Sequence, residues 1–214
     1  MSVGALSLRL RFAARPFESS ELDSLVSRMS VLEKMSTNPK DRWFIGRGSA
    51  AYSSKTRVIF GRRFYERLTE AQRLAVAAHE LVHIREGDAG YAERHVTIPA
   101  LVCWLGPFLV SLALWRIFFV AAILGLVGLE LCLFSSIYSI RGWRRAAELR
   151  CDVVAASFVD GQDLIAALRI LDAFISPAQR RGLSYRLAHW MLPYPSLGER
   201  EEAIGRVTKE SDSL

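Results

Sequence analysis

The chain has 214 residues, of which 51% are hydrophobic, and its 28 Lys and Arg against 22 Asp and Glu give a formal net charge of +6. This length allows one compact domain with a modest core. The positive balance does not indicate a nucleic-acid partner, because no stretch resembles a DNA- or RNA-binding module and much of the excess flanks an apolar run. The three cysteines have no paired spacing, which predicts a reducing compartment without a disulfide framework.

The N-terminal part of the chain predicts short strands around one helix. Residues 6–12 alternate apolar and polar side chains, as a half-buried strand does, and two arginines there rule out the apolar core of a signal peptide. Residues 18–36 have an apolar stripe at helical spacing. Short apolar runs at 43–45 and 57–60 are typical of strands. We therefore expect a small sheet beside a helix.

A longer helix is predicted over about 70–86. Thr69 and Gln72 have the spacing of a capping box, and a run of good helix formers follows them. Gly87 is a typical helix stop. Inside this stretch lies the pattern His-Glu-Leu-Val-His, which places two histidines four residues apart on one helix face.

The spacing of these histidines is that of a zinc site. His79 and His83 lie one turn apart, where both rings can reach a single Zn²⁺ at about 2.0–2.1 Å. Glu80 lies beside them and is the expected general base for a water at the metal. The alternative is a helix that carries two histidines without a metal, because this short pattern also arises by chance.

An apolar run follows at residues 96–140, with only Arg116 and Glu130 charged. A single spanning helix needs about 20 residues, so this run predicts two spans, at about 96–115 and 118–140. The alternative is a pair of buried helices in a soluble core.

Arginines concentrate at the two flanks of the apolar run, which by the positive-inside rule places both flanks in the cytoplasm. We therefore expect an integral membrane protein whose catalytic part faces the cytoplasm and whose hairpin contacts the lipid bilayer. The flanking arginines are Arg85, Arg94, Arg141, Arg144, Arg145 and Arg150.

The third zinc ligand is expected just after the hairpin, since two spans return the chain to the side that it left. Glu148 and Asp152 are four residues apart and share a helix face. Glu148 is the predicted ligand, and Asp152 is predicted to orient a ligating histidine. Cys151 points about 100° away from Asp152 around the helix and is expected to pack. Alternatively, Glu148 is an exposed carboxylate facing nearby arginines.

Three further helices are predicted in the remainder. An amphipathic helix is expected at about 162–174, and Ser176-Pro177 is typical of the start of another. Ser196 and Glu199 form a second capping box that opens a terminal helix. Residues 208–214 are expected to fray.

These motifs together resemble the HtpX-like membrane zinc endopeptidases, which are related to the CAAX prenyl protease. The resemblance rests on the histidine motif, the hydrophobic hairpin and the later Glu148-x-x-x-Asp152, and it extends from about Arg57 to Ile204. It implies an α+β, mainly helical fold with a zincin-type metalloprotease core and a small sheet, interrupted by a transmembrane helical hairpin. The implied division is 1–95 and 141–214 for the catalytic domain and 96–140 for the hairpin.

A late segment also matches this family, which usually carries His-Pro-x-x-x-x-Arg before its final helix. Pro195 and Arg200 match, whereas Tyr194 stands where the family usually has His. The resemblance implies that Arg200 supports the site, and charge matching makes Asp152 its expected partner. Tyr194 and His189 are the expected candidates for donors to an oxyanion.

The implied function is zinc-dependent endoproteolysis with one Zn²⁺ per chain, acting on protein or peptide substrates in membrane-protein quality control. One alternative is a BlaR-type sensor or antirepressor metallopeptidase, which Asp88 and the Cys151-Asp152 pair would suit. Another is a membrane scaffold that retains an inactive protease fold. The sequence determines neither the physiological substrate nor the oligomeric state.

Overall fold

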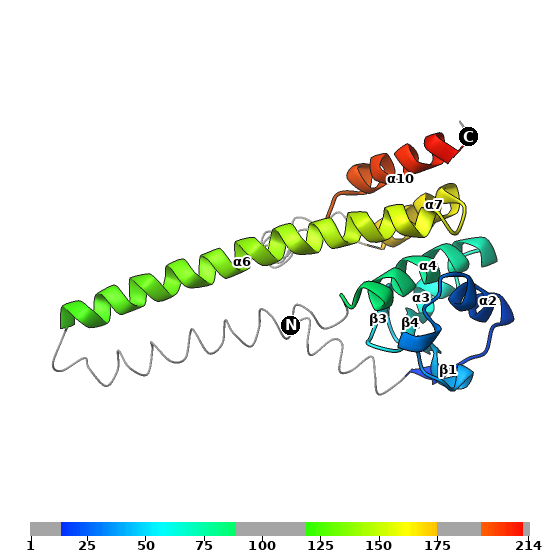
Figure 1. Cartoon of the computed structure of the whole chain (residues 1–214), viewed down its shortest axis with the longest axis horizontal. Helices are drawn as coiled ribbons and strands as arrows, with labels where there is room; N and C mark the ends of the chain where they lie inside the picture. Colours follow the sequence, from blue (N-terminus) through cyan, green and yellow to red (C-terminus); the bar gives the residue numbers. More distant parts are fainter. Residues whose placement is uncertain (1–13, 89–118, 175–193, 212–214) are drawn as a thin grey trace.

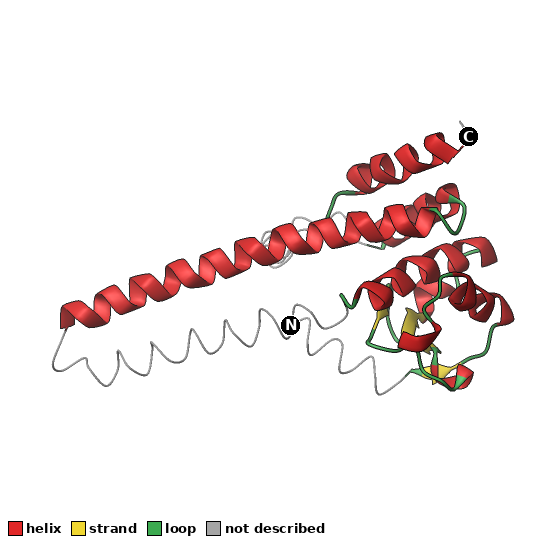
Figure 2. Cartoon of the chain, in the orientation of Figure 1, coloured by secondary structure: helices red, strands yellow, loops and turns green. Residues whose placement is uncertain are grey.

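The computed structural model describes residues 14–88, 119–174 and 194–211. Helices dominate this part of the chain, and the few strands gather at one side of it (Figure 2), in agreement with the expected mainly helical α+β class. Four of the predictions lie outside the described residues: the strand at 6–12, the first span at 96–115, the helix start at 176–177, and His189.

A four-stranded sheet has the order β1-β2-β4-β3. Its strands are Arg15–Pro16 (β1), Trp43–Gly46 (β2), Ala51–Ser53 (β3) and Val58–Gly61 (β4). The two central strands β2 and β4 run parallel, and the edge strands β1 and β3 are antiparallel to their neighbours. Strands β2 and β4 correspond to the predicted strands at 43–45 and 57–60. All four residues of β4 are buried, which makes this strand part of the core.

Helix α4 (Glu70–Glu86) has the predicted bounds and lies at the centre of the packing. It contacts strands β3 and β4, helix α2 (Ser20–Arg28) and helices α6 and α7. The capping box is formed, because Thr69 Oγ1 accepts from the Gln72 amide at 3.3 Å and Gln72 Oε1 accepts from the Thr69 amide at 3.0 Å. Every residue from Ala75 to Val82 is buried, so this stretch of the helix is covered on all sides.

Helix α6 (Phe119–Ala156) has 38 residues, which corresponds to a length of about 57 Å. Its C-terminal part packs on α4, α7 and α10, whereas its N-terminal part extends beyond these helices (Figure 1). The segment predicted as the second span, 118–140, falls almost entirely on this helix, which continues past residue 140 into the Glu148 segment without a break. Within the described residues, a membrane-crossing helix, judged by length and apolar character together, is not found.

The remaining helices differ from the predictions mainly at their ends. Helix α2 ends at Arg28, well before the predicted residue 36, and Ser30 adopts a left-handed φ of 54° that a continuing helix cannot accommodate. The chain between α2 and α4 then forms 3₁₀ turns η1 (Leu32–Lys34) and η2 (Pro39–Asp41) and the short helix α3 (Arg62–Tyr65).

Helices α7 (Gly161–Ala173) and α10 (Leu197–Ser211) pack on each other and on α6. The predicted capping box opens α10, since Glu199 Oε2 accepts from the Ser196 amide at 2.8 Å. Helix α10 runs to Ser211, beyond the predicted start of fraying at 208. This arrangement stacks α10, α6 and α4 across the molecule.

Close packing of α7 against α10 predicts that Gly161 cannot be enlarged. A Cβ atom at this position would lie 2.8 Å from Ile204 Cγ2 and 3.0 Å from Thr208 Cγ2. We expect Gly161→Ala to lower the free energy of unfolding by about 1–3 kcal/mol through overpacking. Chemical denaturation of the purified protein measures this change.

Gly205→Ala is the matched control, because an added Cβ there meets no atom within 4 Å. It lies within α10, where Ala is a better helix former than Gly, so we expect no loss and a gain of up to about 1 kcal/mol. Equal stability of the two variants would contradict the close contact of α7 with α10.

Candidate metal centre

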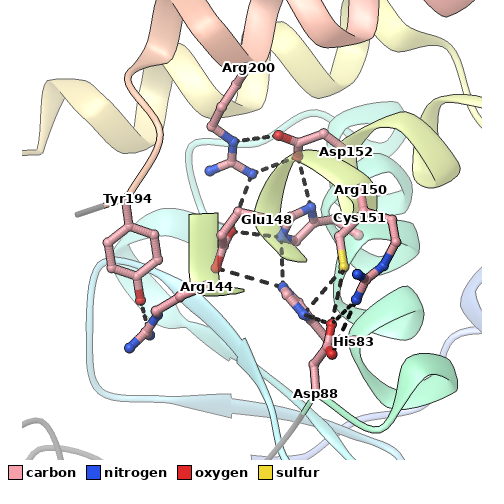
Figure 3. A network of polar contacts seen from close by, with 10 residues as sticks. His83, Asp88, Arg144, Glu148, Arg150, Cys151, Asp152, Tyr194 and Arg200 are labelled. Carbon is pink, nitrogen blue, oxygen red and sulfur yellow. Dashed lines mark hydrogen bonds and ion pairs between the residues drawn. The ribbon is translucent and has the colours of Figure 1, made fainter. Parts of the chain in front are cut away.

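Three side chains from two helices converge where α4 and α6 pack together (Figure 3). His79 and His83 come from α4, and Glu148 comes from α6. The two Nε2 atoms are 3.2 Å apart. Glu148 Oε2 lies 3.4 Å from Nε2 of His79, and Oε1 lies 3.8 Å from Nε2 of His83. The structure therefore brings together the three residues that the sequence predicts as metal ligands.

These separations fit one tetrahedral Zn²⁺. Donor atoms at about 2.0–2.1 Å from a tetrahedral ion are about 3.3 Å from one another. The two Nε2 atoms are 3.2 Å apart, and they lie 3.4 and 3.8 Å from different oxygens of Glu148. One donor atom from each of the three residues lies within 4.8 Å of the others, which is close enough for all three to bind one ion. Two imidazoles and one carboxylate are also a donor set found in catalytic zinc sites, where the fourth position stays open for water or substrate.

The second nitrogen of His79 contacts a buried ion pair. Asp152 Oδ1 lies 2.9 Å from Nδ1 of His79, and the Asp152 side chain is fully buried. Arg200, on α10, donates from Nε and Nη2 to the two oxygens of Asp152, both at 2.6 Å. Such a bidentate pair is strong and directional. The structure thus joins Arg200 to Asp152, the partner that charge matching predicts.

The electrostatic environment of the centre favours cations. Burial by itself lowers the pKa of His79, but the carboxylates of Asp152 and Glu148 outweigh burial and raise this pKa. Burial raises the pKa of Glu148, but His79, Arg200 and His83 outweigh burial and lower it. The pKa of Asp152 is likewise lowered, because Arg200 and His79 outweigh the effect of burial. Both carboxylates are therefore ionised and attract positive charge to the histidines.

The second nitrogen of His83 has neighbours whose contacts the sequence did not predict. Nδ1 of His83 lies 3.3 Å from Asp88 Oδ2 and 3.3 Å from Cys151 Sγ. Arg150 donates from Nη2 to both oxygens of Asp88, at 3.1 and 3.3 Å. Cys151 is buried, as predicted, and burial raises the pKa of its thiol. The sequence signal for the contact between Asp88 and His83 is Gly87, because a glycine that ends a helix turns the following residue back toward the last turn.

The remaining predicted residues lie around this cluster. Glu80, next to His79 on α4, is 8% exposed. Tyr194 is 44% exposed, and its hydroxyl accepts a hydrogen bond from Arg144, whose guanidinium carbon lies 4.6 Å from the ring centroid. The tyrosine side chain is directed toward Arg144 and not toward Asp152 or His83 (Figure 3).

Comparison with known proteins assigns the chain to a family. The sequence profile of peptidase family M48 matches residues 16–208, so the chain belongs to this family, and its class is that of the metallopeptidases. The crystal structure of Ste24p from S. mikatae shares the fold, with a TM-score of 0.56 and 19% sequence identity over 94% of this chain. The chain covers 53% of that protein, about half its length. A comparison with curated protein sequences finds no match.

The buried Arg200–Asp152 pair predicts a large stability effect. Asp152→Asn removes the negative charge and leaves the Arg200 guanidinium, with 11% of its side chain exposed, without its bidentate partner. We expect the free energy of unfolding to fall by about 3–5 kcal/mol, because the buried guanidinium loses its two short hydrogen bonds to a carboxylate and keeps the longer contact with Glu148, at 3.7 Å. Chemical denaturation of the metal-free protein measures the change.

Glu202→Gln is the control, since Glu202 pairs with Arg206 on α10 and both side chains are more than 60% exposed. We expect a loss of at most about 0.5 kcal/mol there. If Asp152→Asn were as stable as this control, the buried pair would contribute nothing to the fold.

Proposed function

We propose that this chain is a membrane-embedded zinc endopeptidase that hydrolyses peptide bonds in protein substrates. The observation that carries the proposal is the convergence of His79, His83 and Glu148 at distances that suit one Zn²⁺, with Glu80 on the same helix. Membership of peptidase family M48 supports the same class of activity. It also favours the HtpX-like assignment over the BlaR type.

In this proposal the two histidines and Glu148 hold the metal through Nε2 and carboxylate oxygens. A bound Zn²⁺ supplies Lewis acidity, which lowers the pKa of water and polarises a carbonyl group. Asp152, whose Oδ1 lies 2.9 Å from Nδ1 of His79, favours a proton on that nitrogen through its negative charge, which leaves the Nε2 lone pair for the metal. Arg200 holds Asp152 in place through its two hydrogen bonds of 2.6 Å.

Glu80 performs the proton transfers. Its carboxylate takes one proton from the attacking water as the water oxygen bonds to the carbonyl carbon of the scissile peptide. It then gives this proton to the peptide nitrogen, and the C–N bond breaks. A metal-holding scaffold without activity does not require this carboxylate, because the metal needs only the three ligands. The presence of Glu80 in the buried part of α4 therefore supports an active enzyme.

Membrane embedding is supported by the apolar run at 96–140 and by side chains on α6. Ile123, Val127 and Leu131 follow one another at four-residue spacing and are 42%, 50% and 66% exposed. Exposed large apolar side chains on one helix face are expected where lipid surrounds the helix. We propose a two-span hairpin between catalytic parts 1–95 and 141–214, which face the cytoplasm, and a role in membrane-protein quality control.

The first test separates catalysis from metal binding. Glu80→Gln removes the proton acceptor, and we expect cleavage of an unfolded protein substrate to fall by at least about 10²-fold. The zinc content, measured by elemental mass spectrometry, should stay at one ion per chain. Glu70→Gln, the same change at an exposed position of α4, is the control and should keep full activity. Full activity of Glu80→Gln would rule out Glu80 as the base.

The ligands are tested by metal retention. His79→Ala, His83→Ala and Glu148→Ala each remove one of the three donors, so we expect each purified variant to have lost most of its zinc after dialysis against a weak chelator. Circular dichroism checks that each variant is folded. Retention of wild-type zinc content and activity by Glu148→Ala would exclude it as the third ligand.

The membrane topology is tested by chemical labelling. A single cysteine at Arg116 should react with an impermeant thiol reagent added outside the cytoplasm, because the hairpin turn faces outward in this topology. A cysteine at Arg145 should react only after the membrane is opened. The background replaces Cys103, Cys132 and Cys151. Labelling of both positions from one side of the intact membrane would contradict the two-span hairpin.

A further inference from the structure

We infer that Asp88, held by Arg150, is a positioning residue for His83 and forms with it a second arginine–carboxylate–histidine chain at the metal centre. This inference rests on the proposed function, in which His83 is a zinc ligand. It assigns a role to two residues that lie outside the histidine motif and its third ligand.

The backbone at the end of α4 brings Asp88 to His83. Gly87 adopts a left-handed φ of 77°, which costs glycine little and other residues more. The Gly87 amide donates to the Ile84 carbonyl at 3.2 Å, and the Asp88 amide donates to the His83 carbonyl at 3.0 Å. These two bonds form a Schellman motif, which folds the chain back over the last turn of the helix. The backbone of Asp88 is therefore hydrogen-bonded to the backbone of His83, and the side chain of Asp88 contacts the His83 ring.

The side chain of Asp88 then contacts the nitrogen of His83 that faces away from the metal ligands. Asp88 Oδ2 lies 3.3 Å from Nδ1, whereas Nε2 is the atom that lies 3.2 Å from His79 and 3.8 Å from Glu148. A carboxylate that accepts the Nδ1 proton fixes the tautomer in which Nε2 carries the free lone pair. Asp88 thus determines which nitrogen of His83 is presented to the metal.

Arg150 fixes Asp88 in turn. Its Nη2 atom donates to both carboxylate oxygens, at 3.1 and 3.3 Å, from a position two residues after Glu148 on α6. The Asp88 side chain is 9% exposed, and that of Arg150 is 42% exposed. The arrangement repeats the one at His79, where Asp152 is held by Arg200, but it lies nearer to solvent. Each ligating histidine therefore has its own carboxylate, and each carboxylate has its own arginine.

Cys151 is the competing neighbour of the same nitrogen, because its sulfur also lies 3.3 Å from Nδ1 of His83. A thiol is a weak acceptor, so the Nδ1 proton favours the carboxylate of Asp88. The sulfur, the carboxylate and Nδ1 are also close enough to surround an ion. Arg150 already places a positive charge 3.1 Å from that carboxylate, which disfavours a cation there.

Zinc affinity of the detergent-solubilised full chain, measured by competition with a chromophoric chelator, tests the inference. We expect Asp88→Ala to weaken affinity by about 10–100-fold, as loss of a partner of a metal ligand does. Asp88→Asn, whose amide oxygen still accepts a hydrogen bond, should recover part of this loss. Arg150→Gln should weaken affinity by a smaller factor, and the double variant should match Asp88→Ala, because Arg150 acts through Asp88. Arg169→Gln, which breaks the ion pair between Arg169 of α7 and Glu201 of α10, should leave affinity unchanged.

A spectroscopic measurement separates positioning from a general loss of structure. In the zinc-loaded protein, the Nδ1 proton of His83 should give a slowly exchanging NMR signal that disappears in Asp88→Ala. The corresponding signal of His79, whose partner is Asp152, should remain and serves as an internal control.

Two results would overturn the inference: wild-type affinity and an unchanged His83 signal in Asp88→Ala, or an equal loss in Cys151→Ala, which would make the thiol the partner. Zinc binding by Glu148→Ala at wild-type affinity would instead reject the proposed ligand set. The Glu148 variant therefore distinguishes failure of the proposed function from failure of the positioning inference.

Discussion

A fully buried carboxylate, that of Asp152, constrains the arrangement of the helices around the centre. Transfer of this charge out of water is unfavourable by several kcal/mol and is offset only by good partners. Asp152 has two such partners, with both Arg200 hydrogen bonds at 2.6 Å and His79 Nδ1 at 2.9 Å. These residues come from α6, α10 and α4. Displacement of any one of these helices would therefore leave a charged group in the interior without one of its partners. The orientation of the His79 ring follows from this constraint.

Helix α6 connects the metal centre to the apolar part of the chain. Glu148, Arg150 and Asp152 occupy alternate positions near its C-terminal end, and they contact both histidines, Asp88 and Arg200. The described part of the same helix starts at Phe119, within the apolar run. If that run lies in the bilayer as we propose, the third ligand is part of a rigid element that enters the membrane. Movement of the hairpin would then act directly on the geometry of the site.

The parts of the structure that the sequence predicts are those with local signals. The capping boxes at Thr69 and Ser196 mark where α4 and α10 begin, and helical spacing alone places the two histidines on one face. Strands β1 and β3 are two and three residues long, too short for a period of two to be visible. The early end of α2 depends on the left-handed backbone at Ser30, which no residue type there indicates.

The contacts at the site also divide into those that the sequence indicates and those that depend on how the helices pack. The Asp152–Arg200 pair could be predicted, because two opposite charges lie in motifs that a shared family places together. The contact of Asp88 with His83 needs both the turn at Gly87 and the packing of α6 on α4, and only the turn is visible in the sequence. The direction of the Tyr194 side chain depends on Arg144, fifty residues earlier, and local pattern carries no information about it.

X-ray absorption at the zinc edge of the metal-loaded wild-type chain tests the central claim most directly, because it reports the atoms bound to the ion. The account predicts only nitrogen and oxygen neighbours at about 2.0–2.1 Å, with multiple scattering from two imidazole rings. A sulfur neighbour at about 2.3 Å would place the ion at Cys151, in the second cluster formed with His83 and Asp88. Sulfur ligation, or scattering from a single imidazole, would contradict a site built from His79, His83 and Glu148.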